Sequence, residues 1–178
     1  LVYALVPAFL GDDFIDYLTI AGQKLFVHAS APLTTLFDCK PDNLQAFLDN
    51  LHTSAVSIGW KDIFNIPTAI VEEGNDNKDV DNFHLMTEYS QLTLTQVYTH
   101  VESYVEHENH AAQDYMQLFL CLKQFLTLEA LNLILLHADQ YNVSGTKSGS
   151  CLLKVIIHES YIDTNATINC FIHECLIS

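Results

Sequence analysis

Apolar residues recur with a helical period over most of this chain, and the clearest stripe follows Pro41. Proline suits the first helical position because its missing N–H would be unpaired there in any case. Gly59 follows the last apolar position of the stripe, where a left-handed C-cap is expected. The pattern therefore predicts an amphipathic helix. Its stripe is formed by Leu44, Phe47, Leu48, Leu51, Ala55 and Ile58.

A short apolar segment and a polar stretch follow this helix. A short second helix or turn, which Pro67 stops, is predicted from Trp60, Ile63, Phe64 and Ile66. Residues 72–82 hold five carboxylates, but their spacing does not follow the pattern of an EF-hand calcium loop. We therefore interpret residues 72–90 as an acidic linker.

Apolar residues with a helical period occur again after this linker. Thr93 and Gln96 have the spacing of a capping box, in which the two residues satisfy each other's free backbone N–H groups. Another helix is predicted from about Ala111 to Leu126, and Thr127 is the N-cap expected for the next one. The second half of the chain therefore begins with three predicted helices.

The last part of the chain predicts a connector and two further helices. Residues 141–149 have a turn-rich composition, and Ser148 or Ser150 is the expected N-cap of the helix that follows. A final helix is predicted beyond Asp163. Its apolar stripe still runs where the sequence stops, and the first residue is not Met, so we expect a truncated copy of a longer protein. That stripe includes Ile168 and Ile172.

These patterns together predict an all-α fold, a bundle of roughly six to seven helices arranged as one unit or as two small lobes. We divide the chain into a loosely packed N-terminal arm (1–20), an N-terminal helical lobe (21–71), the acidic linker (72–90) and a C-terminal helical lobe (91–178). The predicted core and assembly scaffold consists of Leu44, Phe47, Leu48, Leu51, Trp60, Val97, Val101, Phe119, Leu122, Leu131, Val155, Ile156, Ile168 and Ile172.

The net charge of the chain argues against some classes of function. The 178 residues include 22 acids and only 7 bases, all of them Lys, which gives a net charge of −15. Proteins that bind nucleic acids normally carry a basic face that neutralises phosphates. This chain has no Arg and no zinc-knuckle motif, so we expect no direct nucleic-acid binding.

Cysteine content and hydropathy indicate a cellular location. The chain has five Cys, an odd number without the spacing of a disulfide framework, which favours a reducing compartment. No apolar run reaches the roughly 18 residues that a membrane span needs. We therefore expect a cytoplasmic protein that does not contact a membrane.

Few residues suggest metal or catalytic chemistry. His107 and His110 lie three apart between two acids and form the densest metal-like cluster, but the HExxH spacing is absent, so we favour a polar turn between helices. Cys170, His173 and Cys175 would not share one face of a helix. Asp163 begins a triplet like that of aspartic proteases, with Asn in place of Gly, and a helix cap explains it better. We expect no enzyme activity, no metal and no cofactor.

The order of several short stretches resembles the capsid-like part of the Gag protein of copia-type LTR retrotransposons, as found in protists, algae and fungi. The first half contributes residues 21–26 (AGQKLF) and 37–48 (FDCKPDNLQAFL). The second half contributes residues 92–97 (LTLTQV), 121–130 (CLKQFLTLEA), 152–157 (LLKVII) and 161–167 (YIDTNAT).

The resemblance implies a helical, capsid-like fold, a homo-oligomer that forms a shell, and an indirect role in packaging the element's RNA. Abundant His and Cys without any Arg fit cytosine-to-thymine decay of Arg codons, so we interpret the chain as a degenerate copy, a non-functional remnant of such an element. The alternative is an acidic helical protein–protein interaction module with no transposon activity, whose charge suits a basic partner protein.

Overall fold

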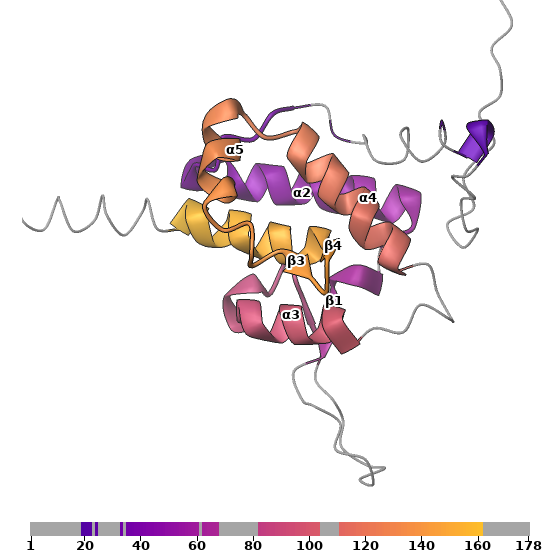
Figure 1. Cartoon of the computed structure of the whole chain (residues 1–178). Helices are drawn as coiled ribbons and strands as arrows, with labels where there is room; N and C mark the ends of the chain where they lie inside the picture. The colour runs from indigo at the N-terminus through magenta and orange to yellow at the C-terminus, as the bar shows by residue number, and fades with distance from the viewer. Residues whose placement is uncertain are drawn as a thin grey trace, which may run out of the picture.

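The described part of the computed structural model comprises residues 19–22, 24, 33, 35–60, 62–67, 82–103 and 111–161. These residues form a mostly helical fold with two small two-stranded antiparallel sheets (Figure 1). The all-α prediction is therefore confirmed only coarsely, because short strands accompany the helices. None of the helices in this part of the chain is long and apolar enough to span a membrane.

The first long helix, α2, runs from Pro41 to Ile58, as its stripe and flanking residues predict. Pro41 occupies the first turn, and Gly59 ends the helix with a φ of 86°, in the left-handed region that glycine adopts without steric cost. The N–H of Trp60 then donates to the carbonyl of Ala55 at 3.0 Å, which closes the last turn.

The segment after α2 differs from the expected second helix. A 3-10 turn, η1 (Asp62–Phe64), leads into strand β1 (Asn65–Pro67), which pairs antiparallel with β2 (Asn82–His84). A second 3-10 turn, η2 (Tyr89–Gln91), follows β2.

The acidic linker predicted for residues 72–90 needs a correction over its last part. Residues 72–81 lie outside the described residues. Residues 82–90, in contrast, form β2 and the start of η2, and Leu85 and Met86 between them are buried in the core. Two large apolar side chains within this mostly polar stretch explain the difference, because burying them stabilises the fold.

The predicted caps start the helices of the second half. Helix α3 (Leu94–Ser103) begins with the expected box: Gln96 N–H donates to Thr93 Oγ1 at 3.2 Å, and Thr93 N–H donates to Gln96 Oε1 at 2.8 Å. Helix α4 spans Ala111–Gln124. Helix α5 spans Leu128–Leu135, and its N-cap Thr127 accepts the N–H of Ala130 at 3.3 Å.

A tight hairpin connects α5 to the last described helix. Strands β3 (Asn142–Val143) and β4 (Thr146–Lys147) pair across Ser144 and Gly145, which have φ values of 49° and 86°. Positive φ at both central residues gives a turn whose twist matches that of the strands. The prediction of a turn-rich connector is confirmed here, with an added pair of strands.

The helix over residues 149–161, here named the central helix, lies between α2 and α3 (yellow in Figure 1). Ser148 is its N-cap and accepts the N–H of Cys151 at 3.3 Å. Ser150 donates from Oγ to the carbonyl of Ile63 at 2.9 Å, which ties the helix to η1. The buried side chains of this helix are Ser150, Cys151, Leu152, Leu153, Val155, Ile156, Ile157 and Ser160.

The central helix and α4 approach each other closely at Gly149. A Cβ atom at this position would lie 2.5 Å from Cβ of Leu118 and 2.5 Å from the backbone nitrogen of Phe119. Nearby, the indole N–H of Trp60 donates to Oε1 of buried Gln117 on α4 at 2.9 Å. Only glycine fits this crossing, and the buried polar pair satisfies the one side-chain donor of Trp60.

One hydrophobic cluster includes both predicted lobes, since it extends from Leu33 to Ile157. Phe37 forms an isolated parallel bridge with Leu126: Phe37 N–H donates to the carbonyl of Phe125 at 2.7 Å, and Thr127 N–H donates to the carbonyl of Phe37 at 3.0 Å. The described parts of the two halves thus share a core. The predicted arm (1–20), apart from Thr19 and Ile20, and the predicted final helix lie outside the described residues.

Candidate functional site

The residues that suggested metal binding lie outside the part that the structure describes: His107, His110, Cys170, His173 and Cys175. Within the described residues, no group of three or more His, Cys, Asp or Glu side chains is arranged to hold a metal ion. Asp163, the residue that suggested a protease triplet, also lies outside them. The interpretations of His107 and His110 as part of a polar turn and of Asp163 as a helix cap therefore stay predictions.

The thiols of the core are structural. Cys39, Cys121 and Cys151 are buried and unpaired with one another. Burial raises the pKa of Cys39 and of Cys121 to about 12, and that of Cys151 to about 11. A thiol acts as a nucleophile through its thiolate form, and these three thiols stay protonated at neutral pH.

Two histidine contacts link neighbouring elements. His137, just after α5, places Nε2 3.1 Å from Oε1 of Glu159 on the central helix. His52 on α2 and His84 on β2 have ring centroids 5.5 Å apart. Burial, and secondarily the neighbouring His52, lowers the pKa of His84. Both contacts hold neighbouring elements together.

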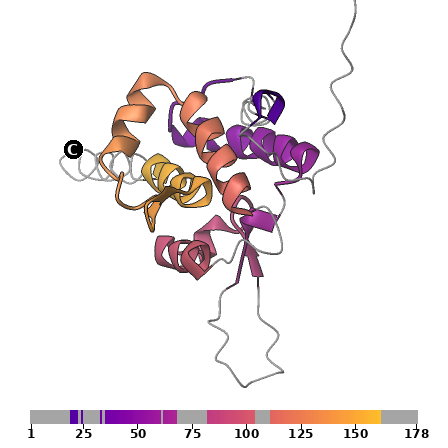
Figure 2. The ribbon, with the colours of Figure 1, turned by 45° about the vertical axis from the view of Figure 1, so that its right-hand side comes forward.

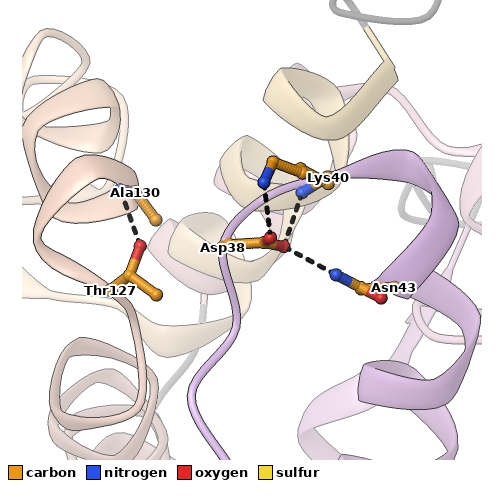
Figure 3. A network of polar contacts seen from close by, with 5 residues as sticks. All are labelled: Asp38, Lys40, Asn43, Thr127 and Ala130. Carbon is orange, nitrogen blue, oxygen red and sulfur yellow. Dashed lines mark hydrogen bonds and ion pairs between the residues drawn. The ribbon is translucent and has the colours of Figure 1, made fainter.

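A polar network around Asp38 surrounds the start of α2 (Figure 3). Oδ1 of Asp38 accepts the backbone N–H of Lys40 and the side-chain amide of Asn43, both at 3.1 Å. Burial alone would raise the pKa of Asp38, but the hydrogen bonds from Asn43 and Lys40 keep it below its ordinary value. The cap of α5, in which the Ala130 N–H donates to Thr127 Oγ1, is a separate contact that Figure 3 also shows.

Several exposed leucines lie on α5 and on the residue that follows it. Ala130 and Ile134 hold the helix against the core, whereas Leu128 is 69% exposed, Leu135 60% and Leu136 78%. Leu133 is also exposed. We name Leu128, Leu133, Leu135 and Leu136 the leucine face. Apolar side chains gathered on one exposed face commonly mark an interaction site.

Other exposed apolar side chains stand apart on different elements. Val56 lies on α2, Leu120 on α4, and Leu36 just before the bridge at Phe37. Single exposed apolar residues are normal on soluble proteins and need no functional explanation. The leucine face differs from them because four leucines lie within nine consecutive residues, 128–136.

A pocket of about 190 Å³ lies between the end of α3, the start of α4 and the β3–β4 hairpin. The amino group of Lys147, one of its lining residues, lies 5.3 Å from the centroid of the Tyr141 ring. This volume is below the range typical of sites for drug-sized ligands. The lining residues are Val101, Glu102, Ala112, Tyr115, Val143, Ser144, Thr146, Lys147 and Ser148.

The predicted scaffold residues divide by burial. Val101, Phe119 and Leu131 are partly buried and pack against the core. Ile168 and Ile172 lie outside the described residues. The buried members are Leu44, Phe47, Leu48, Leu51, Trp60, Val97, Leu122, Val155 and Ile156.

The sequence pattern places only Leu131 of this helix in the predicted scaffold and assigns no role to the four exposed leucines. The structure buries Ala130 and Ile134 and packs Leu131 partly against the core. A signal was present in the sequence, since leucines at 128, 131, 133, 135 and 136 make α5 and the residue after it apolar around most of the circumference. A short helix that is apolar on several sides has more apolar surface than one core contact can bury.

Fold and surface together define a mostly helical protein with an acidic composition and one exposed leucine face. Comparison of the chain with models of protein families, with curated proteins and with solved structures gives no match.

Proposed function

We propose that this chain is a capsid-like structural protein of the Gag type, which self-associates through the leucine face of α5. The exposure of these leucines is the observation that carries the proposal. Covering a leucine side chain contributes roughly 1.5–3 kcal/mol relative to leaving it in water. Many kinds of protein self-associate. We choose a shell-forming protein because the order of several sequence stretches resembles copia-type Gag.

The charge distribution supports a second copy as the partner of this face. The chain has a net charge of −15, so two copies repel each other at long range. Within residues 128–136 the sole charged side chain is Glu129, so the leucine face itself adds little repulsion. Contact through an uncharged apolar surface is the arrangement that brings two acidic copies together with the least electrostatic repulsion.

The proposal assigns the chain a structural role in a reducing, cytoplasmic environment, without catalysis and without direct contact to nucleic acid. Its three buried thiols are consistent with such an environment. Any part in RNA packaging is then indirect, through the shell. A degenerate copy of a Gag protein would keep the fold and lose part of this association.

Light scattering coupled to size-exclusion chromatography over a concentration series tests the proposal. We expect oligomers that grow with concentration and that become stronger as NaCl rises from about 0.05 to 0.5 M, because salt screens the repulsion between acidic copies. The variant Leu135→Asn/Leu136→Asn should associate more weakly, whereas the control Val56→Asn should behave as wild type. A monomer at every concentration and salt level would refute self-association.

The net charge favours one second candidate, an acidic adaptor for a basic partner protein. In that case association with the partner weakens as salt rises, which is opposite to the behaviour expected of self-association. The same chromatography with a basic peptide such as polylysine, at low and high salt, separates the two candidates.

A further inference from the structure

Two tyrosines from distant parts of the chain meet at the end of the central helix. Tyr89 belongs to η2, and Tyr161 lies in the last described turn of the central helix, 72 residues further along. Their hydroxyl oxygens lie 2.6 Å apart in a hydrogen bond, and their ring centroids lie 5.8 Å apart with 42° between the ring planes. Figures 1 and 2 both show the central helix directly above α3, the helix that follows η2 in the chain.

A second contact from the central helix holds Tyr89 in place. The Nζ atom of Lys154 donates to the backbone carbonyl of Tyr89 at 2.6 Å. Lys154 and Tyr161 are seven residues apart, which places them about two turns apart on the same side of the helix. This side of the helix therefore contacts both the backbone and the hydroxyl of Tyr89, so the two phenols keep a defined relative position.

Tyr161 is also accessible to an oxidant. One-electron oxidants take electrons from tyrosine, tryptophan and cysteine side chains, and among the described residues of these three types Tyr161 is the most exposed, at 43%. Trp60 and the three described cysteines are buried. A radical formed at Tyr161 therefore has a second phenol in direct hydrogen-bond contact. The other described tyrosines are buried or partly buried, namely Tyr89, Tyr98, Tyr115 and Tyr141.

We propose that Tyr89 and Tyr161 form an oxidative cross-linking site, at which a carbon–carbon bond between ortho positions joins the two rings as dityrosine. Each ortho carbon is two bonds from its hydroxyl oxygen, so the contact between the oxygens also brings ortho carbons close together. The product holds its two hydroxyl groups side by side, as the folded chain already does. Reacting atoms that start near their final geometry need little further movement.

The oxidant is hydrogen peroxide, used through a haem peroxidase. Each phenol loses one electron and its hydroxyl proton and becomes a phenoxyl radical. The two radicals pair their electrons in the new bond between ortho carbons. The hydrogen of each bonded ortho carbon then moves to its phenol oxygen as a proton, which restores both aromatic rings. Hydrogen peroxide takes up the two electrons and the two protons and leaves as two molecules of water.

The cross-link fixes the end of the central helix to η2 by a bond that thiols do not cleave. Disulfides, in contrast, exchange with thiols. Joining residues that are 72 positions apart closes a long loop, which lowers the entropy of the unfolded chain. The inference does not depend on the proposed self-association, because both rings belong to one copy and neither belongs to the leucine face.

Oxidation of the 178-residue chain at low concentration, with a haem peroxidase and hydrogen peroxide, tests the site. A partner within the same chain has an effective concentration of about millimolar, so at micromolar protein we expect coupling within one chain to exceed coupling between chains roughly a hundredfold or more. The blue fluorescence of dityrosine should appear. The melting temperature should rise by about 5–10 °C, because the closed loop destabilises the unfolded state.

Mass spectrometry after trypsin digestion locates the bond. Cleavage after lysine places Tyr89 in the peptide 79–123 and Tyr161 in the peptide 155–178, which has no other tyrosine. The cross-linked product should join these two peptides and be two hydrogens lighter than their sum. Oxidation in concentrated urea should lose this selectivity, because the unfolded chain no longer holds the two phenols together.

Phenylalanine variants and a matched control identify the partner within the first peptide. Tyr161→Phe and Tyr89→Phe each keep the ring but lack the phenol that forms the radical, so each should abolish the joined peptide. The control Tyr98→Phe removes another tyrosine of the peptide 79–123 and should leave the yield unchanged. Circular dichroism checks that each variant is folded, and two independent variants cover the case that one of them is not.

The outcomes separate this inference from the proposed function. If folded wild type gives no dityrosine, gives mainly covalent dimers, or still forms the joined peptide after Tyr89→Phe, the inference is overturned, while reversible self-association through the leucine face is unaffected. A chain that is monomeric at every concentration but forms the joined peptide would refute the proposed function and support the cross-linking site.

Discussion

The central helix and α5 are both rich in apolar residues, but the structure buries most of those in the central helix and leaves many of those in α5 exposed. Residues 151–157 of the central helix are all buried except Lys154, which is partly buried. Helix α5 buries only Ala130 and Ile134, and its leucine face remains in solvent. Apolar content alone therefore does not decide burial. The number of neighbouring elements does, since the central helix lies between α2 and α3 and α5 lies at the edge (Figure 1).

The largest expected effect comes from truncating one leucine in each region. Leu152→Ala in the central helix should lower the free energy of unfolding by roughly 2–5 kcal/mol, because it leaves a cavity in a fully buried site. The matched change Leu135→Ala on α5 should alter it by less than about 0.5 kcal/mol. Urea unfolding followed by circular dichroism measures both values. Equal losses would mean that the leucine face is covered within the monomer.

Thiol labelling compares the same two regions in the folded state. In a background with Cys170→Ser and Cys175→Ser, Cys151 should react with a maleimide far more slowly than a cysteine introduced by Leu135→Cys. Burial raises the pKa of Cys151 from its ordinary value of 9.0 to about 11, so its thiolate fraction at pH 8 falls about 100-fold before restricted access is counted. The folded pKa is the higher one, so the stability that Cys151 contributes is complete below pH 9.0 and is lost as pH rises through about 11.

A single added methyl group at Gly149 should disrupt the close packing of the central helix against α4. Gly149→Ala should lower the free energy of unfolding by about 1–3 kcal/mol, because its methyl group would meet Leu118 and the backbone of Phe119. Gly145→Ala is the matched control in the hairpin. Its added methyl group has no neighbour within 4 Å, and its cost comes only from a φ of 86°, on the order of 1–2 kcal/mol. Thermal unfolding of both variants measures the two losses, and we expect the larger loss for Gly149→Ala.

The smallest expected effect concerns the caps that start the two helices. Ser148→Ala and Thr127→Ala each remove a side-chain acceptor from a first-turn N–H group, which costs about 1 kcal/mol. Because Thr127 also orients the leucine face, we expect Thr127→Ala to weaken self-association in addition, whereas Ser148→Ala should leave it nearly unchanged. Sedimentation equilibrium at matched folded fractions measures the difference.

Local chemistry made part of this fold predictable. Pro41, Gly59, the Thr93–Gln96 box and Thr127 act on the backbone within four residues, so the sequence alone reveals their role. The pairing of β1 with β2 was not predictable in this way. Asn65 lies opposite His84, and no local signal links positions so far apart in the chain.

The candidate site was likewise predictable only where a local pattern in the sequence decides which residues are buried. The apolar stripe of α2 correctly predicts which residues face the core, because polar residues separate its members and leave a single apolar side. In α5 apolar residues occupy several sides, so the sequence does not indicate which side meets the core. The pocket is formed by three separate elements and has no sequence signature at all.

The bridge between Phe37 and Leu126 has a consequence for biosynthesis. Both backbone hydrogen bonds of Phe37 in this bridge involve residues 125 and 127, which the ribosome makes long after Phe37 itself. A nascent chain that ends before α5 therefore exposes the buried stripe of α2 without its final partners. Chains with such distant contacts fold slowly and expose apolar surface for longer. We expect a chaperone that recognises apolar helices to engage α2 during translation and to leave once α5 has emerged.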